Sequence, residues 1–164
     1  MKAHPMPCGQ TSWAFREGEL GRDDVRALLA HHVAEMNAGS PPSVCHVLAA
    51  DALADPAIRF ITLRDEGGAL IGTGALKAFD PGHGELKSMR TAPAALGRGV
   101  GSTMLAHLVA TARAAAMTRL SLETGNSPLF AAANHLYRRD GFTRCGPFGG
   151  YRPSDFTLFY TREI

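Results

Sequence analysis

The sequence predicts a mixed α+β domain of the α/β class, built on a mostly antiparallel sheet that includes one parallel pair of strands. Three strand-like segments joined by short turns follow one another between residues 58 and 91, which indicates an antiparallel meander. A helical segment then leads to a further strand, and a strand–helix–strand unit makes neighbouring strands parallel. With 164 residues, the chain is expected to form one domain over residues 1–164, with residues 1–10 loosely ordered.

The N-terminal third is expected to hold one short strand and two helices. Residues 11–16 form the strand. Asp23 and Asp24 place negative charge at the start of the first helix, where the helix dipole favours it, and apolar residues follow at helical spacing. Pro41-Pro42 ends this helix because a proline pair cannot continue it. Residues 44–53 form a second, shorter helix.

The middle of the chain is expected to form three strands, at residues 58–63, 70–79 and 85–91. Gly67-Gly68 and Asp80-Pro81-Gly82 supply the turns between them. In the third strand, regular alternation places residues on two opposite faces. One face holds Leu86, Ser88 and Arg90, and the other holds Glu85, Lys87 and Met89.

The C-terminal half alternates helices with strands. Its first helix spans residues 99–116. Ser127 is an N-cap candidate for the second helix, Pro128 suits its first position, and Gly141 ends it. The strands of this half cover residues 120–124, 142–145 and 156–161.

The composition excludes several classes of protein. Seventeen Lys and Arg against fifteen Asp and Glu give a net charge of +2, too balanced for a protein that binds nucleic acid mainly through phosphates. Apolar stretches end well short of the roughly 20 residues that cross a bilayer, and residues 1–5 do not resemble a secretory signal. Cys8, Cys45 and Cys145 are scattered and no CxxC pair occurs, which argues against disulfides and a metal site. We therefore expect a cytoplasmic protein with no nucleic-acid or membrane partner and no metal; a homodimer stays open.

The most informative segment is the glycine-rich loop, Leu96-Gly97-Arg98-Gly99-Val100-Gly101-Ser102. It follows a strand and opens a helix, so backbone N–H groups and the helix N-terminus can together bind an anion such as phosphate. No Gly-Lys-Ser/Thr follows, so the loop is not a Walker loop, and it lacks the acidic partner of a dinucleotide fingerprint. On its own, the segment also fits a plain turn between strand and helix.

The segments around this loop carry a resemblance to a known family. Gly84–Pro93, the glycine-rich loop, Leu120–Thr124 and Ala133–Phe142 together resemble the GNAT superfamily of acetyl-CoA-dependent N-acetyltransferases. The tail over residues 145–153 and the Ser40-Pro41-Pro42 segment resemble a bacterial subgroup of small GNAT proteins whose substrates are mostly unassigned. The resemblance extends from about Trp13 to the C-terminus. It implies the GNAT fold: a twisted, mostly antiparallel sheet of about seven strands, a splayed parallel pair, and helices on both faces.

The resemblance also implies which residues bind acetyl-CoA. The pantetheine arm would pair with the backbone at the end of the strand before the loop, and the pyrophosphate would bind the loop. Leu96 departs from the family, which usually has Gln or Arg there, but most of the loop's contacts come from the backbone, and Arg98 can supply a side-chain donor. The implied cofactor-binding residues are Met89, Arg90, Thr91, Leu96, Gly97, Arg98, Gly99, Val100, Gly101, Ser102 and Asn134.

Three residues are implied for catalysis. Tyr137 lies on a core-facing helical stripe, and its phenol, with a pKa near 10, could protonate a departing thiolate. Glu123 matches a base in the ribosomal-protein acetyltransferases, and Glu85 stands where other members hold a water-linked base. A backbone N–H near Met89 would polarise the thioester carbonyl. Each glutamate could instead be held in a salt bridge, for example with Lys87, and we favour Glu123 as the base.

The acceptor pocket is the least defined part of the resemblance. Its expected wall residues are Met36, Ser40, Pro41, His46, Phe148 and Tyr151. We expect transfer of an acetyl group to a primary amine of a small acceptor, by direct attack in a ternary complex. The alternatives are a non-catalytic acyl-CoA-binding sensor, a nucleotide-binding domain, and an acetyltransferase for protein N-termini or lysines.

Overall fold

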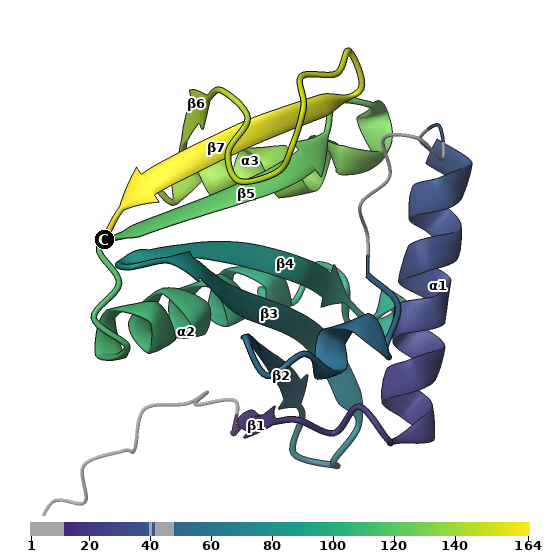
Figure 1. The fold of residues 1–164 in the computed structure, drawn as a ribbon. Coiled ribbons are helices and arrows are strands. Elements are labelled where there is room, and N and C mark those ends of the chain that lie inside the picture. The colour runs from purple at the N-terminus through teal and green to yellow at the C-terminus, as the bar shows by residue number, and fades with distance from the viewer. Residues whose placement is uncertain (1–11, 40, 42–47) are drawn as a thin grey trace, which may run out of the picture.

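A computed structural model describes residues 12–39, 41 and 48–164 of the protein, and they form seven strands and three α-helices (Figure 1). The strands are β1 (Ala14–Glu17), β2 (Ile58–Arg64), β3 (Leu70–Asp80), β4 (His83–Thr91), β5 (Arg119–Gly125), β6 (Thr143–Cys145) and β7 (Thr157–Glu163). The α-helices are α1 (Asp23–Gly39), α2 (Val100–Ala114) and α3 (Ala131–Arg139). Short 3-10 helices are η2 (Ala52–Ala54), η3 (Pro93–Ala95) and η4 (Pro128–Phe130).

All seven strands belong to one sheet, in the order β1-β2-β3-β4-β5-β7-β6. Strands β4 and β5 pair in parallel, whereas the other neighbouring strands of this sheet pair antiparallel. The predicted fold class is therefore confirmed: a seven-stranded, mostly antiparallel sheet with one parallel pair.

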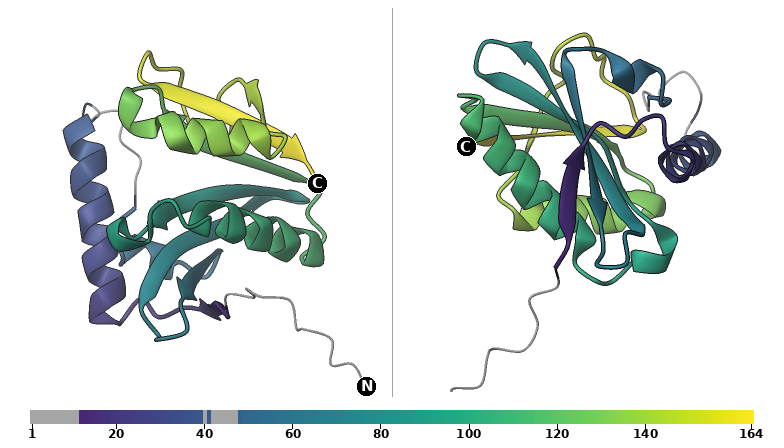
Figure 2. Two further views of the ribbon diagram at one scale, coloured as in Figure 1. Left: turned by 180° about the vertical axis from the view of Figure 1, so that it is seen from behind. Right: turned by 90° about the horizontal axis from the view of Figure 1, so that it is seen from below.

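Helices cover both faces of the sheet, as predicted. Figure 2 shows α2 and α3 on one face and α1 on the other. On the α1 face, Val25 and Leu29 pack against Phe60 and Ala75 of the sheet. The larger core lies on the α2 and α3 face. It includes the fully buried side chains of Leu63, Leu76, Met104, Leu105, Leu108, Leu120 and Leu122.

Charged side chains anchor the start of α1 to strand β2. Arg64 is almost fully buried, and its guanidinium contacts Glu19 at 2.9 Å and Asp24 at 2.7 Å. The hydrogen bond from Arg64 holds the pKa of the Asp24 carboxyl well below its usual range. This buried arginine uses all three of its nitrogens in hydrogen bonds, so it fixes one end of the helix that lies beside the site.

The parallel pair of strands is joined over only part of its length. Residues 83–86 of β4 pair with residues 119–122 of β5. Beyond Leu86 and Leu122 this pairing ends, and in Figure 1 the two strands diverge towards α1. The second half of β4 therefore has backbone groups along one edge that no strand among the described residues pairs.

A β-bulge in β4 changes which side chains share a face. Thr73 pairs with Arg90 and Ala75 with Lys87, so two residues of β4 stand opposite one residue of β3. Ser88, inside the bulge, has a φ of 51°, which is unusual for a residue other than glycine.

The predicted faces of β4 are consequently wrong beyond Lys87. Met89 packs against the core on the α2 face, together with Leu86. Arg90 instead contacts Glu35 of α1, so it lies on the same face as Lys87. Regular alternation failed because one additional residue shifts every following side chain to the opposite face.

Most other element predictions differ only at their ends, but the short helix expected over residues 44–53 is wrong in its described part, where residues 48–51 are not helical. Ser127 precedes η4, but its side chain makes no capping hydrogen bond, and α3 proper begins at Ala131. Of the short helix expected over residues 44–53, residues 44–47 lie outside the described part, and the rest contributes only η2. Within the described residues, no helix combines the length and apolarity needed to cross a membrane.

Candidate active site

A pocket of about 180 Å³ opens where β4 and β5 diverge. Its wall combines side chains from α1, both strands, η4, α3 and the segment before β7. The lining residues that bear chemistry are Glu85, Lys87, Ser88, Arg90, Glu123, Tyr137, Tyr151 and His32. The pocket thus brings together residues more than 100 positions apart in the chain.

Glu85 and Lys87 form a buried charged network with Tyr151. The Lys87 ammonium donates to Glu85 Oε1 and to Tyr151 Oη, both at 2.8 Å, and the Tyr151 hydroxyl donates to Glu85. The Glu85 residue is 6% exposed. Burial, and then the hydrogen bond and charge of Glu85, raise the pKa of Tyr151 above its usual value. Tyr151 therefore keeps its proton at neutral pH and holds it towards Glu85.

Glu123 lies on the same sheet face as Glu85, one residue beyond the part of β5 that pairs with β4. Its neighbour across the ladder is Phe159, whose ring contacts that of Tyr151 with centroids 5.8 Å apart. The charge of Glu123 also contributes to the raised pKa of Tyr151. Two carboxylates, Glu85 and Glu123, therefore line the pocket on its α1 side.

Tyr137 enters the pocket from the opposite side of the sheet. It packs in the α2 and α3 core against Phe142 and Tyr160, and it also lines the pocket. Burial raises the pKa of its phenol to about 12. At neutral pH the hydroxyl is therefore protonated and can act as a proton donor.

Helix α1 supplies a third wall, in which His32 and Met36 lie one turn apart. Arg90 of β4 donates to Glu35, and Glu35 also lies 3.1 Å from His31 Nε2. Burial, and then the charge of Arg90, lower the pKa of His32 to about 4. This wall therefore carries a cationic guanidinium beside an imidazole that is neutral at pH 7.

The glycine-rich loop follows the C-terminal end of β4, after η3, and lies outside the lining of this pocket. Gly97 and Gly99 have φ values of 75° and 82°, a region that other residues adopt only with strain. Gly99 is the N-cap of α2, whose first turn contains no acidic residue. The positive end of the helix is consequently available to an anion.

Side chains around the loop already have partners. The Arg98 guanidinium lies 5.6 Å from the centre of the Trp13 ring, and Arg139 donates to the Ser102 hydroxyl. A Cβ on Gly101 would stand 3.3 Å from Leu136, so this glycine lets α2 approach α3. Gly101 therefore has a packing role that Gly97 and Gly99 do not share.

Comparison with known proteins decides the family. A family model described as "Acetyltransferase (GNAT) family" matches residues 25–142. The uncharacterized N-acetyltransferase YedL of Escherichia coli (strain K12) is 44% identical over 152 residues, which are 93% of this chain and 95% of that protein. The chain belongs to the GNAT acetyltransferase family. It is therefore an acyltransferase, as the sequence predicted.

Two further comparisons agree with this assignment. The IAA acetyltransferase of Azospirillum brasilense is 39% identical over 126 residues, 76% of this chain and 80% of the relative. The crystal structure of a GNAT-family acetyltransferase from Staphylococcus aureus MU50 superposes with a TM-score of 0.70 and 16% identity, covering 93% of this chain and 99% of that one. At that identity the structure supports the GNAT fold alone.

The GNAT site residues predicted from the sequence fall into two groups. Tyr137, Glu123, Glu85, Met89 and Arg90 all line the pocket. Thr91 and the loop residues, Leu96, Gly97, Arg98, Gly99, Val100, Gly101 and Ser102, lie at the far end of β4 or the start of α2. Asn134 is buried behind the pocket, where its Nδ2 donates to the Gly125 carbonyl at 2.9 Å.

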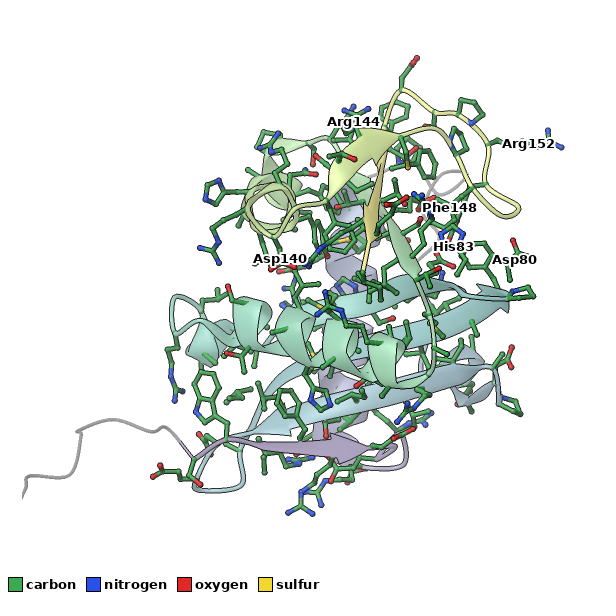
Figure 3. All side chains as sticks on the ribbon, turned by 90° about the vertical axis from the view of Figure 1, so that its left-hand side faces the viewer. Asp80, His83, Asp140, Arg144, Phe148 and Arg152 are labelled. Atoms are coloured by element: carbon green, nitrogen blue, oxygen red, sulfur yellow. The ribbon has the colours of Figure 1, made fainter. Side chains whose placement is uncertain are left out.

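The predicted acceptor residues are brought together only in part. Met36 and Tyr151 line the GNAT pocket, whereas Pro41 and Phe148 are not among its lining residues. Phe148 packs behind Tyr151, with ring centroids 5.2 Å apart, and Figure 3 shows it beside His83. Ser40 and His46 lie outside the described residues.

Several side chains of the pocket were not identified from the sequence. Phe130 lies over Gly125, where any added Cβ would overlap its ring, and it lines the pocket beside Leu129. His32 could have been found from its spacing to Met36, one helical turn later on the same face. Among the described residues, no group of three or more His, Cys, Asp or Glu side chains is placed to hold a metal ion.

Proposed function

We propose that this GNAT protein transfers an acetyl group from acetyl-CoA to the primary amine of a small acceptor, by direct attack in a ternary complex. One observation carries the proposal. The opening between β4 and β5 has carboxylates on its α1 side and the Tyr137 phenol on its other side. A proton acceptor and a proton donor therefore flank the same space. The acceptor can take a proton from an ammonium so that the neutral amine attacks the thioester, and the donor can protonate the departing thiolate.

The C-terminal end of β4 and the loop that follows it suit an acyl-CoA. The strand edge at Met89, Arg90 and Thr91 has lost its neighbour and can pair with amide groups of a pantetheine arm. The loop around Gly97 and Gly99, with the N-terminus of α2, suits a pyrophosphate. When bound there, acetyl-CoA supplies an activated acyl thioester.

Glu123 is the proposed base. A primary amine has a pKa near 10, so most of it is charged at pH 7 and one proton must leave before attack. Glu85 lies within the paired part of β4 and β5, and its Oε1 accepts hydrogen bonds from Lys87 and Tyr151. Glu123 lies one residue beyond the last pair, at the opening itself, which favours it for proton removal and leaves Glu85 to hold Tyr151 and Lys87 in place.

Tyr137 is the proposed acid. Its raised pKa keeps the proton on the phenol until a departing sulfur accepts it. The bulge at Ser88 leaves backbone groups of β4 outside the regular ladder, and an N–H near Met89 is suited to polarise the carbonyl under attack. Donor and acceptor then act from opposite faces of the sheet without moving.

The size of the pocket supports a small acceptor. Its volume, about 180 Å³, lies below the roughly 300–1,000 Å³ that drug-sized ligands occupy. A long peptide would need an open groove beyond this volume. The name of the Azospirillum brasilense relative, IAA acetyltransferase, adds IAA to the compounds worth testing.

The direct test measures free thiol released from acetyl-CoA in the presence of small primary amines, IAA and short peptides. We expect release with small amines, and mass spectrometry should identify the acetylated amine. Without any acceptor, the protein should retain no labelled acetyl group, as direct attack requires. Tight CoA binding with no thiol release across the panel would contradict the proposal, and release with peptides alone would replace the small acceptor by a protein substrate.

A further inference from the structure

The α1 wall of the pocket contains hydrogen-bonding atoms that the protein does not use. Arg90 Nε, Ser88 Oγ and His32 Nδ1 are buried and have no hydrogen-bond partner among the described residues. All three residues line the pocket. Buried polar groups in native proteins are nearly always paired, so three orphan atoms along one wall indicate a missing partner.

Arg90 differs from Arg64 and Arg59, two other ion-paired arginines of this sheet, because its buried Nε has no partner among the described residues. Arg64 uses Nε, Nη1 and Nη2 in hydrogen bonds, and Arg59 grips Glu17 through Nε and Nη2, both at 2.9 Å. Within the part of the chain that the structure describes, Arg90 donates through Nη2 alone, to Glu35. Its guanidinium is therefore held in place by Glu35 while most of its planar set of donors stays unused.

The neighbouring cation on the strand is committed elsewhere. Lys87 donates to Glu85 and Tyr151, so it faces the β5 side of the pocket. His32 is 8% exposed and, with its lowered pKa, is a neutral imidazole that can donate one hydrogen bond. Arg90 and His32 together thus offer hydrogen-bond donors to an anion. Lys87, on the same strand, does not compete for this anion because it already binds Glu85 and Tyr151.

We infer that the acceptor carries a carboxylate beside its amine, and that Arg90 and His32 bind this carboxylate at the α1 wall. A guanidinium matches a carboxylate in shape and charge better than any other common side chain. The inference rests on the proposed function, because it places the amine end of the same molecule near Glu123.

The rest of the wall defines the remaining part of the acceptor. Apolar side chains surround the pocket between the α1 wall and η4: Met36, Leu48, Leu129 and Phe130. They suit an aliphatic or thioether side chain. The acceptor class is therefore a small amino acid with an apolar side chain.

The test compares amines that differ only in the carboxylate. L-leucine is paired with 3-methylbutylamine and L-methionine with 3-(methylthio)propylamine, and L-leucinamide keeps the α-amine but lacks the charge. We expect kcat/KM to be at least about tenfold higher for each amino acid than for its partners. Equal or better turnover of the amines without a carboxylate would overturn the inference while leaving the proposed function in place.

Arg90→Gln should raise the KM for L-leucine by about 10- to 100-fold, and kcat/KM should fall at least about tenfold further for L-leucine than for 3-methylbutylamine. The KM for acetyl-CoA should not change, because only the backbone of Arg90 is assigned to the cofactor. Arg59→Gln, which removes an arginine from another ion pair on the sheet, is the matched control. Should the single variant unfold because Glu35 is left unpaired, Arg90→Gln with Glu35→Gln removes both charges together.

Calorimetry of L-leucine binding to the CoA-loaded protein gives a readout that does not depend on turnover. Binding that is lost in the Arg90 variants and kept in Arg59→Gln supports the inference. Binding of 3-methylbutylamine as tight as that of L-leucine, or L-leucine binding that the Arg90 variants retain, overturns it. Absence of thiol release with every amine, together with L-leucine binding that depends on Arg90, would contradict the proposed function alone.

Discussion

The two faces of the sheet meet at the opening between β4 and β5, and they differ in chemistry. On the α2 and α3 face, Tyr137 stands among apolar side chains, and burial alone raises the pKa of its phenol. On the α1 face, Glu85 and Lys87 neutralise each other and orient Tyr151. The difference shows that one opening can hold a proton donor in an apolar environment and proton acceptors in a charged environment. The two environments stay distinct because they lie on opposite faces of the sheet.

A change at the N-terminus of α2 should have the largest effect, on the affinity for CoA. Gly99→Asp places a side chain where φ is 82° and adds negative charge at the N-terminus of α2, so CoA affinity should fall by more than about 100-fold. Calorimetry with CoA measures this. Gly99→Ala carries the strain without the charge and should lose much less.

Gly99→Asp is a sharper test than a change at Gly101. A side chain at Gly101 would also press on Leu136 and disturb α3. Unchanged CoA affinity in a folded Gly99→Asp protein would contradict the assignment of the pyrophosphate to this loop.

Removing the proposed base on the other face should have the next largest effect. Glu123→Gln should lower kcat about 100-fold at pH 7, and turnover should recover partly near pH 10, where free amine is abundant. Rate profiles between these pH values measure the effect. Glu85→Gln is the matched control, and it should keep the wild-type shape of the profile because Glu85 already binds Lys87 and Tyr151. The reverse result would make Glu85 the base.

Tyr137→Phe should reduce kcat by about 10- to 100-fold and leave the KM for acetyl-CoA nearly unchanged. No hydrogen bond to its hydroxyl occurs within the described part of the chain, so thermal unfolding should shift little. Single-turnover kinetics with thiol detection checks the rate. A variant with normal turnover per folded molecule would give Tyr137 a packing role only.

The smallest effect concerns stability on the α1 side. The pKa of His32 is lowered from 6.5 to about 4, so the unfolded chain binds the extra proton more readily than the folded protein does. Stability should therefore fall as the pH drops from about 6.5 to 4, by at most about 3 kcal/mol from this residue. Urea unfolding at pH 7 and pH 4.5 should show a smaller difference for His32→Gln. His135→Gln, at an exposed position, should behave like wild type, and equal pH dependence in all three proteins would contradict the role of His32.

The sequence predicted those features that depend on neighbouring residues. The glycine-rich loop, the order of helices and strands, and the inward position of Tyr137 follow from local spacing, and the structure has them as expected. The network of Glu85, Lys87 and Tyr151 could not be predicted in the same way. Tyr151 reaches Lys87 across 64 positions of the chain, and the pairing of β5 with both β4 and β7 brings these parts of the chain together.

The α1 wall was missed for a different reason. Its chemistry depends on the direction in which Arg90 points, and that direction is reversed by the bulge at Ser88. A bulge is a mismatch between two strands, so it cannot be seen in either strand alone. The resemblance supplied the positions of backbone contacts at Met89, Arg90 and Thr91 but not the face to which their side chains turn.

The extra residue at Ser88 also determines which changes this protein can tolerate as it diverges. Deleting one residue there would send the Arg90 side chain into the apolar core and Met89 out of it, so a length change at this point is excluded. Substitutions at Lys87 and Arg90, in contrast, change side chains that line the pocket and leave the core in place. Single side chains lining the pocket can therefore be exchanged during evolution without changing which residues of β4 face the core.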